Sequence, residues 1–197
     1  MKKLKYKRRK ICVITSSRAD YGQLKPLIKL INKDKKLILK LVVSGSHLVK
    51  NLGFTQKEIK KDKIKISSRV NLNIKGFSEK QICNYTGEAI KKFSKCFSNL
   101  NPDIILVLGD RYEIFSAVTS ALILNIPVAH LHGGEITLGV IDDAFRHSIT
   151  KMSDIHFTVN RNFRNRVINM GENPKNVYEV GSLSAENIKS AKFLSKN

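Results

Sequence analysis

Short apolar runs alternate along the chain with amphipathic segments of helical length, and this alternation constrains the fold more than any other feature. Runs such as KICVITSS (10–17) and PDIILVLGD (102–110) are rich in β-branched residues, which predicts buried strands. Strands that are apolar on both faces and separated by helices are typical of a parallel sheet covered on both sides. We therefore predict an α/β fold with a parallel sheet and helices on both of its faces. Further strands are expected at 37–45, 126–134, 155–160 and 177–182, and helices at 21–34, 78–100, 111–125, 142–153 and 161–171.

Residues 46–77 interrupt this alternation. They are expected to form mostly loop, with a short helix around 55–61 and a strand near 64–66. Ser78 is the expected N-cap of the long helix that follows. The length of 197 residues suits one domain or one and a half.

Membrane and secreted classes of protein are not expected. No apolar run approaches the roughly 18 residues that a membrane helix needs. The basic start MKKLKYKRRK is followed by ICVIT, which is too short for the apolar part of a signal peptide. The three cysteines show no metal-binding spacing and cannot all pair, and Cys12 falls within an apolar strand. These features predict a cytoplasmic protein with reduced thiols and no metal site.

The net charge of +20 is confined to the first half of the chain. Residues 1–100 hold 26 Lys and Arg against 6 Asp and Glu, whereas residues 101–197 hold 10 of each kind, so only the first half could attract a polyanion. The lysines are scattered through stretches such as KEIKKDKIKI and are not interleaved with aromatic residues. This pattern favours solvated helix faces over a nucleic-acid platform.

Polar side chains follow the predicted strands at 10–17, 37–45, 102–110 and 126–134. In parallel sheets, ligands bind at the carboxyl ends of the strands. Arginines and helix N-termini can hold phosphate there, and acids close to one another raise each other's pKa toward the range used in proton transfer. We therefore predict a site that binds an anion and moves protons. The strand-end residues are Thr15, Ser16, Ser17, Arg18, Asp20, Ser44, Gly45, Ser46, His47, Gly109, Asp110, Arg111, His130, His132, Gly133, Gly134 and Glu135, with Asp142 and Arg146 on the following helix.

Structural roles are an alternative for individual members of this set. Asp110 could cap the helix that follows it, and Asp142 and Arg146 have the four-residue spacing of an ordinary helix ion pair. SSRAD could be a capped turn, and His47 could be a surface or internally bonded histidine. Neither a GxxxxGK[ST] loop nor GxGxxG occurs, so no dinucleotide cofactor is expected. Three further residues are expected to have structural roles: Glu113 and Asp143 as first-turn helix acids and His156 as a core histidine.

Taken in order, the motifs SSRADYGQLKPL, SGSHL, PDIILVLGDRYE, VAHLHGGEITLGVIDDAFRHSITKMSDIHF and VGS resemble the hydrolysing UDP-N-acetylglucosamine 2-epimerases. The resemblance is strongest to the branch that serves sialic and legionaminic acid synthesis, and it runs from about residue 10 to residue 185. It implies one half of a GT-B-type architecture, in which two Rossmann-like domains face each other. Residues 1–185 would form the N-terminal domain, and 186–197 would begin the crossover to a C-terminal domain that this sequence lacks, supplied in cis or in trans.

The resemblance also implies roles for the strand-end residues. Asp110 and Asp142 match essential acids, and His132 stands where other branches carry a glutamate, whose role Glu135 could share. These four are the catalytic candidates. The substrate-binding candidates are Arg18, Asp20, His47, Arg111, His130, Arg146 and His147, with Arg18 near the nucleotide phosphates and Arg146 in the cleft.

The family reaction removes the proton from sugar C2 and expels UDP from C1. Water then adds at C1 and a proton returns at C2 from the opposite face, giving N-acetylmannosamine and UDP. The resemblance implies a UDP-sugar as partner, no cofactor or metal, and a homo-oligomer in the full-length form. Neither a nucleic acid nor a membrane is an expected partner.

Two alternatives to a complete epimerase site remain open. The chain could be half of a GT-B-like nucleotide-sugar transferase, which shares the fold and the anionic donor. It could also be a non-catalytic nucleotide-sugar-binding module. In either case, and also for an epimerase half, we expect the isolated chain to be inactive or nearly so.

Overall fold

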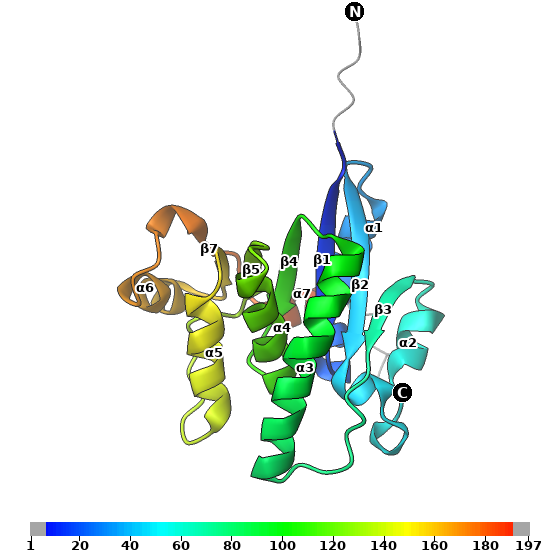
Figure 1. Ribbon diagram of the computed structural model, residues 1–197. Coiled ribbons are helices and arrows are strands. Elements are labelled where there is room, and N and C mark those ends of the chain that lie inside the picture. Colours follow the sequence, from blue (N-terminus) through cyan, green and yellow to red (C-terminus); the bar gives the residue numbers. More distant parts are fainter. Residues whose placement is uncertain (1–6, 191–197) are drawn as a thin grey trace, which may run out of the picture.

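The computed structural model describes residues 7–190, which form one seven-stranded parallel sheet with helices on both faces (Figure 1). This confirms the predicted Rossmann-like α/β fold. The strands are β1 (Arg9–Thr15), β2 (Leu37–Ser44), β3 (Ile66–Val70), β4 (Ile104–Leu108), β5 (Val128–Leu131), β6 (Ile155–Thr158) and β7 (Val177–Glu179). The α-helices are α1 (Arg18–Lys33), α2 (Gln56–Lys61), α3 (Glu79–Leu100), α4 (Tyr112–Ile123), α5 (Ile141–Lys151), α6 (Arg161–Asn169) and α7 (Leu183–Ser190). Short 3-10 turns are η1 (Gly45–Leu48), η2 (Lys50–Leu52) and η3 (Pro174–Asn176).

The strand order, β3-β2-β1-β4-β5-β6-β7, reverses direction between β1 and β4. The chain moves outward from β1 to β3, returns to the middle of the sheet at β4, and then moves outward to β7. Val13 of β1 lies between Leu41 of β2 and Leu106 of β4 in register. The two connections that leave β1 and β4 therefore diverge to opposite sides, which opens a crevice at the carboxyl ends of these strands.

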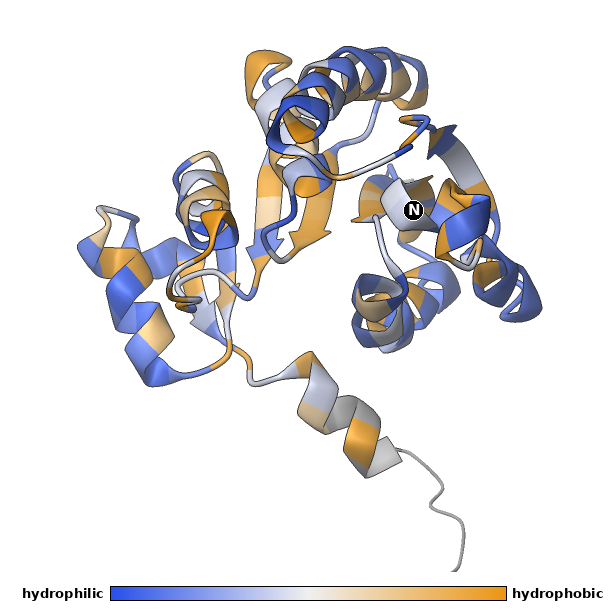
Figure 2. Ribbon diagram, turned by 90° about the horizontal axis from the view of Figure 1, so that it is seen from below, coloured by the Kyte–Doolittle hydropathy of each residue, from blue (hydrophilic) through white to orange (hydrophobic). Residues whose placement is uncertain are grey.

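Successive residues of the central strands point into two separate cores, because side chains of a strand alternate between the faces of the sheet. One core holds Cys12 and Ile14 together with residues of α3, α4 and α5, while the other holds Val13 together with residues of α1 and α2. Figure 2 looks along the sheet and shows helices on both of its sides. The buried helix residues are Ala89, Phe93, Cys96, Phe97, Tyr112, Ile114, Ala117, Val118, Ala121 and Ile149 on the first face and Tyr21, Leu24, Ile28, Ile31 and Ile59 on the second.

Local chemistry explains where the elements begin. Helix α1 starts at Arg18, three residues before the predicted start, because Ser17 and Asp20 form a reciprocal capping box. Ser78 caps α3 as predicted, through a bond to the backbone N–H of Gln81. The strand expected near 64–66 lies at Ile66–Val70 as an edge strand, and α7 was not expected. Leu183 of α7 packs against the second core, and α7 crosses position 185, where the sequence places the domain boundary.

None of the helices within residues 7–190 is long and apolar enough to cross a membrane. The three cysteines are free thiols. Cys12 is buried in the first core, as predicted for an apolar strand residue, and burial raises the pKa of its thiol.

Candidate functional site

The carboxyl ends of β4, β5 and β6 are joined by backbone hydrogen bonds, so the residues that follow them share one edge. Leu108 pairs with Leu131 in register, and Gly109 N–H donates to the Leu131 carbonyl at 3.3 Å. His132 N–H donates to the Phe157 carbonyl at 2.9 Å. Asp110 and His132 therefore follow the ends of adjacent strands and lie at similar heights along this edge of the sheet.

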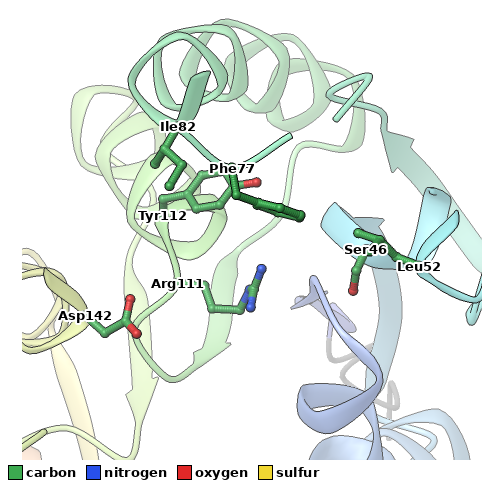
Figure 3. A pocket seen from close by; sticks show the side chains of 7 residues that line it. All are labelled: Ser46, Leu52, Phe77, Ile82, Arg111, Tyr112 and Asp142. Atoms are coloured by element: carbon green, nitrogen blue, oxygen red, sulfur yellow. The ribbon is translucent and has the colours of Figure 1, made fainter. Parts of the chain in front are cut away.

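A cleft of about 480 Å³ lies at the point where the strand order reverses. Figure 3 shows Arg111 between Asp142 on one side and Ser46 and Leu52 on the other. Its apolar lining comes from Leu52, Phe77, Ile82 and the ring of Tyr112, and its polar lining comes from Ser46, Arg111 and Asp142, with Leu52 beside Ser46 (Figure 3). A lining that combines a cation with apolar side chains suits a ligand with an anionic part and an uncharged part.

Asp110 is paired with Arg146 of α5, and it does not cap α4. Arg146 contacts the Asp110 carboxylate through Nη2 and donates from Nη1 to Thr137 Oγ1 at 2.9 Å. The helix ion pair that the spacing of Asp142 and Arg146 suggested is not formed; Asp143 lies 3.8 Å from the same guanidinium instead. The Asp142 carboxylate is thus left on the wall of the cleft.

Burial raises the pKa of Asp110, and the nearby Asp142 raises it further, although the Arg146 guanidinium acts in the opposite direction. A carboxyl group with a raised pKa is closer to the range in which it can give and take protons near neutrality. The contribution of Asp142 agrees with the expectation that an acid at this edge raises the pKa of a neighbouring acid.

His132 is held by Glu135 and leaves one ring nitrogen without a partner. Its Nδ1 lies 3.0 Å from Glu135 Oε1, and its buried Nε2 has no hydrogen bond within the described part of the chain. A carboxylate on Nδ1 favours the tautomer with the proton there, which leaves Nε2 as an acceptor. The backbone of His132 has a left-handed φ of 65°, an uncommon conformation for a residue with a side chain, so the turn that presents this imidazole is strained.

Two of the predicted binding histidines lie inside the protein, away from the cleft surface. His47 bonds through Nε2 to Thr15 at 2.9 Å and through Nδ1 to Thr55 at 2.6 Å. His130 bonds through Nε2 to the Gly109 carbonyl at 2.9 Å and through Nδ1 to Thr150 at 3.2 Å. Both are fully buried, and burial lowers the pKa of His47 to about 4 and that of His130 to about 3. They are neutral near pH 7 and hold the strand-end loops in place.

The remaining predicted binding residues occupy different surroundings. The Asp20 carboxylate accepts bonds from the backbone and hydroxyl groups of Ser16 and Ser17, so it stabilises the first strand-end turn. Arg18 is 75% exposed and pairs with Glu58 at 3.1 Å. His147 Nε2 lies 3.5 Å from Asp143. The structure therefore places Arg111 and Asp142 on the cleft lining, pairs Asp110 with Arg146 next to them, and leaves Asp20, His47 and His130 in the scaffold.

Sequence reasoning missed two features of the site: the contact of Glu113 with Arg111 and the apolar lining of the cleft. Glu113 was expected to be a first-turn helix acid, and it is one, but it is completely buried against Arg111. Phe77 and Ile82 come from a region expected to be loop and from the start of α3, so no strand-end rule pointed to them. The core role predicted for His156 is confirmed by its burial and by its contact with Glu172 at 3.2 Å.

Comparison with known proteins identifies the family. Residues 29–197 match the model of the family described as UDP-N-acetylglucosamine 2-epimerase. The chain is 40% identical over 189 residues to a GDP/UDP-N,N'-diacetylbacillosamine 2-epimerase (hydrolyzing) of Campylobacter jejuni, covering 96% of this chain and 49% of that protein. It is 35% identical over 180 residues to a UDP-N,N'-diacetylbacillosamine 2-epimerase (hydrolyzing) of Legionella pneumophila, covering 91% and 48%. The chain thus spans about half the length of the curated relatives it matches.

Solved structures support the same fold. The Staphylococcus aureus MnaA–UDP co-structure superposes with a TM-score of 0.82 at 20% identity, covering 96% of this chain and 49% of that one. The Neisseria meningitidis UDP-GlcNAc 2-epimerase bound to UDP-GlcNAc gives a TM-score of 0.81 at 20% identity, covering 91% and 48%. The fold is that of one Rossmann-like half of the GT-B architecture, and the chain belongs to the UDP-N-acetylglucosamine 2-epimerase family.

Proposed function

We propose that this chain forms the N-terminal half of the active site of a hydrolysing UDP-N-acetylglucosamine 2-epimerase. In this proposal residues 1–185 are the N-terminal domain, residues 186–197 begin the crossover to a second domain, and the assembled enzyme is a cytoplasmic homo-oligomer. The observation that carries the proposal is a cleft that combines Arg111 and Asp142 with apolar side chains, next to Asp110 and His132 at the ends of the adjacent strands β4 and β5.

The reaction needs a base and an acid at sugar C2 and a cation at the departing diphosphate. The C2–H electron pair forms the C1–C2 double bond while the C1–O pair leaves with UDP. Water then supplies hydroxide to C1, and a proton returns to C2. The unpartnered Nε2 of His132 supplies a base, and Asp110, whose pKa burial raises, supplies an acid. Arg111 supplies the cation, and Asp142 shares the cleft wall with it.

The apolar part of the cleft lining favours one class of sugar as a second candidate substrate. Leu52 and Phe77 both line the cleft and are 39% and 53% exposed, so a ligand can bury both. Acetamido and methyl groups gain from such burial, whereas free hydroxyl groups lose hydration there. A 2,4-diacetamido-6-deoxy sugar therefore fits this apolar lining better than N-acetylglucosamine does, in accord with the names of the Campylobacter and Legionella relatives.

The test joins this chain to the second half of the Campylobacter relative and supplies each UDP-sugar in deuterated water. We expect release of UDP and of a sugar carrying deuterium at C2, because the proton removed there exchanges with solvent before it is replaced. The isolated chain, as control, should release little or no UDP.

The outcomes separate the alternatives. Transfer of the sugar without deuterium at C2 would indicate a transferase half, and binding of UDP without its release from any UDP-sugar would indicate a binding module. Turnover by the isolated chain at the rate of an ordinary enzyme would contradict the half-site proposal.

A further inference from the structure

A completely buried carboxylate, that of Glu113, lies directly behind the arginine of the cleft wall. Arg111 Nε lies 3.2 Å from Glu113 Oε2, and Arg111 Nη2 lies 3.2 Å from Glu113 Oε1. Two parallel bonds of this kind fix the plane of a guanidinium as well as its position. Arg111 nevertheless remains 38% exposed, and no residue of the described chain bonds to its Nη1. The free edge of the guanidinium is therefore available to a ligand in the cleft (Figure 3).

The backbone of Gly45 completes the enclosure of Glu113. Gly45 has a left-handed φ of +55°, and a Cβ added there would lie 2.6 Å from Glu113 Oε1 and 2.5 Å from the Ser16 carbonyl oxygen. Neither contact is tolerable for a real side chain. The carboxylate thus fits only because residue 45 has no side chain, and it lies close to Ser16 and Gly45, which follow β1 and β2.

Such a group is not explained by stability. Burying a carboxylate loses its hydration, and an apolar side chain of similar size in the same space usually serves the folded state as well or better. Burial raises the pKa of Glu113, which records this penalty, while Arg111 acts in the opposite direction. A buried acid that forms two hydrogen bonds with a partly exposed arginine is suited to holding the guanidinium of that arginine in one orientation.

We propose that Glu113 is a positioning residue, which holds the Arg111 guanidinium in the orientation that receives the diphosphate of a nucleotide, in a space that Gly45 leaves open. This inference rests on the proposed use of the cleft for a UDP-sugar. Glu113 itself does not touch the ligand, so it acts only through Arg111.

The test measures the dissociation constants of UDP and uridine for this chain and its variants. Arg111→Ala should weaken UDP binding about 10- to 100-fold, since it removes a charge-assisted contact. Glu113→Gln should weaken it about tenfold, because a neutral amide holds the guanidinium less firmly. Uridine binding should be unchanged in both. Glu79→Gln, a first-turn glutamate exposed on α3, is the matched control and should leave UDP binding unchanged.

The double variant distinguishes positioning from general structural support. If Glu113 acts through Arg111, Arg111→Ala with Glu113→Gln should bind UDP no more weakly than Arg111→Ala alone. Additive losses, equal losses for uridine and UDP, or unchanged UDP affinity in Glu113→Gln would each overturn the proposal, as would a lack of UDP binding by the unsubstituted chain. If Glu113→Gln does not fold, Glu113→Asp replaces it: the shorter carboxylate should weaken UDP binding severalfold, and unchanged affinity would again overturn the proposal.

The proposed function can fail separately. A two-domain protein that leaves every UDP-sugar intact, while UDP binding still depends on Glu113 only through Arg111, would refute the epimerase proposal and support the positioning role.

Discussion

The polar groups at the strand ends have different surroundings in the two halves of the sheet, the first half being β1 to β3 and the second half β4 to β7. At the ends of β1 and β2, Asp20 and His47 have all their bonding capacity occupied by protein groups. At the ends of β4 and β5 and on α5, several buried polar atoms have no partner among the described residues: Tyr112 Oη, His132 Nε2, Arg146 Nε and His147 Nδ1. Buried polar groups are normally satisfied, and unsatisfied ones call for a reason such as catalysis or an absent ligand. Among the described residues the Oε1 atom of Gln23 on α1 is also unpartnered, but the contrast at the strand ends supports the proposal that the groups after β4 and β5 contact the ligand.

The largest effect, on catalysis, should come from substituting the acids in the second half of the sheet. In the two-domain protein described above, Asp110→Asn and Asp142→Asn should each raise the activation barrier by roughly 3–6 kcal/mol, on the scale of an acid–base step with its electrostatic support. Turnover of UDP-sugar measures this. Asp34→Asn, on an exposed turn at the far end of α1, is the control and should retain full activity. Near-normal turnover in either active-site variant would remove that acid from the mechanism.

A smaller effect, on stability, should come from the buried histidines. Because the pKa of His130 is lowered to about 3 from an ordinary value near 6.5, its contribution to stability is complete above pH 6.5 and is lost as pH falls through 3. The free energy of unfolding should therefore fall by up to about 1.4 kcal/mol per pH unit for this group over that interval. His47, with a pKa of about 4, should act in the same direction between pH 6.5 and 4.

Chemical denaturation at several pH values measures this dependence. In His130→Gln the difference from the unsubstituted chain should shrink steadily as the pH is lowered from 6.5, because the variant lacks the titrating group. A difference that does not vary with pH would show that His130 is not held neutral by burial.

The next effect, also on stability, should come from filling the space at Gly45 behind the cleft. Gly45→Ala should lower the free energy of unfolding by about 2–3 kcal/mol, from a left-handed backbone and from overlap with Ser16 and Glu113. Gly139→Ala is the matched control: its φ is +78°, but nothing lies within 4 Å of the added Cβ, so about 1 kcal/mol is expected. Equal losses in the two variants, measured by chemical denaturation, would mean that crowding at Gly45 contributes nothing.

The smallest effect should come from the exposed pair of the first half. Arg18 and Glu58 are 75% and 41% exposed, and pairs of this kind contribute little because water screens them. Arg18→Ala should change the free energy of unfolding by less than about 0.5 kcal/mol. A loss above 1 kcal/mol would show that the first half depends on this contact more than its exposure suggests.

The alternation of apolar runs was sufficient to predict the parallel α/β fold, because it reports burial on both faces of each strand. The helix beginning after Ser78 followed from capping chemistry in the same way. Two structural alternatives for site residues were wrong: the pairing of Asp142 with Arg146 and the capping of α4 by Asp110. Both used spacing along one element, and Arg146 instead pairs with Asp110 across two elements. Helix spacing cannot anticipate a competing partner from another strand.

By itself, the sequence determined which residues stand at the ends of the strands and hence at which edge of the sheet the polar groups gather, since that depends only on periodicity and chain order. Only the tertiary structure decided which of those groups form hydrogen bonds inside the protein and which remain accessible to a ligand. Hydrogen bonds such as those of His47, His130 and Glu113 join residues tens of positions apart or lie behind another side chain, and whether they form depends on packing that no local pattern records.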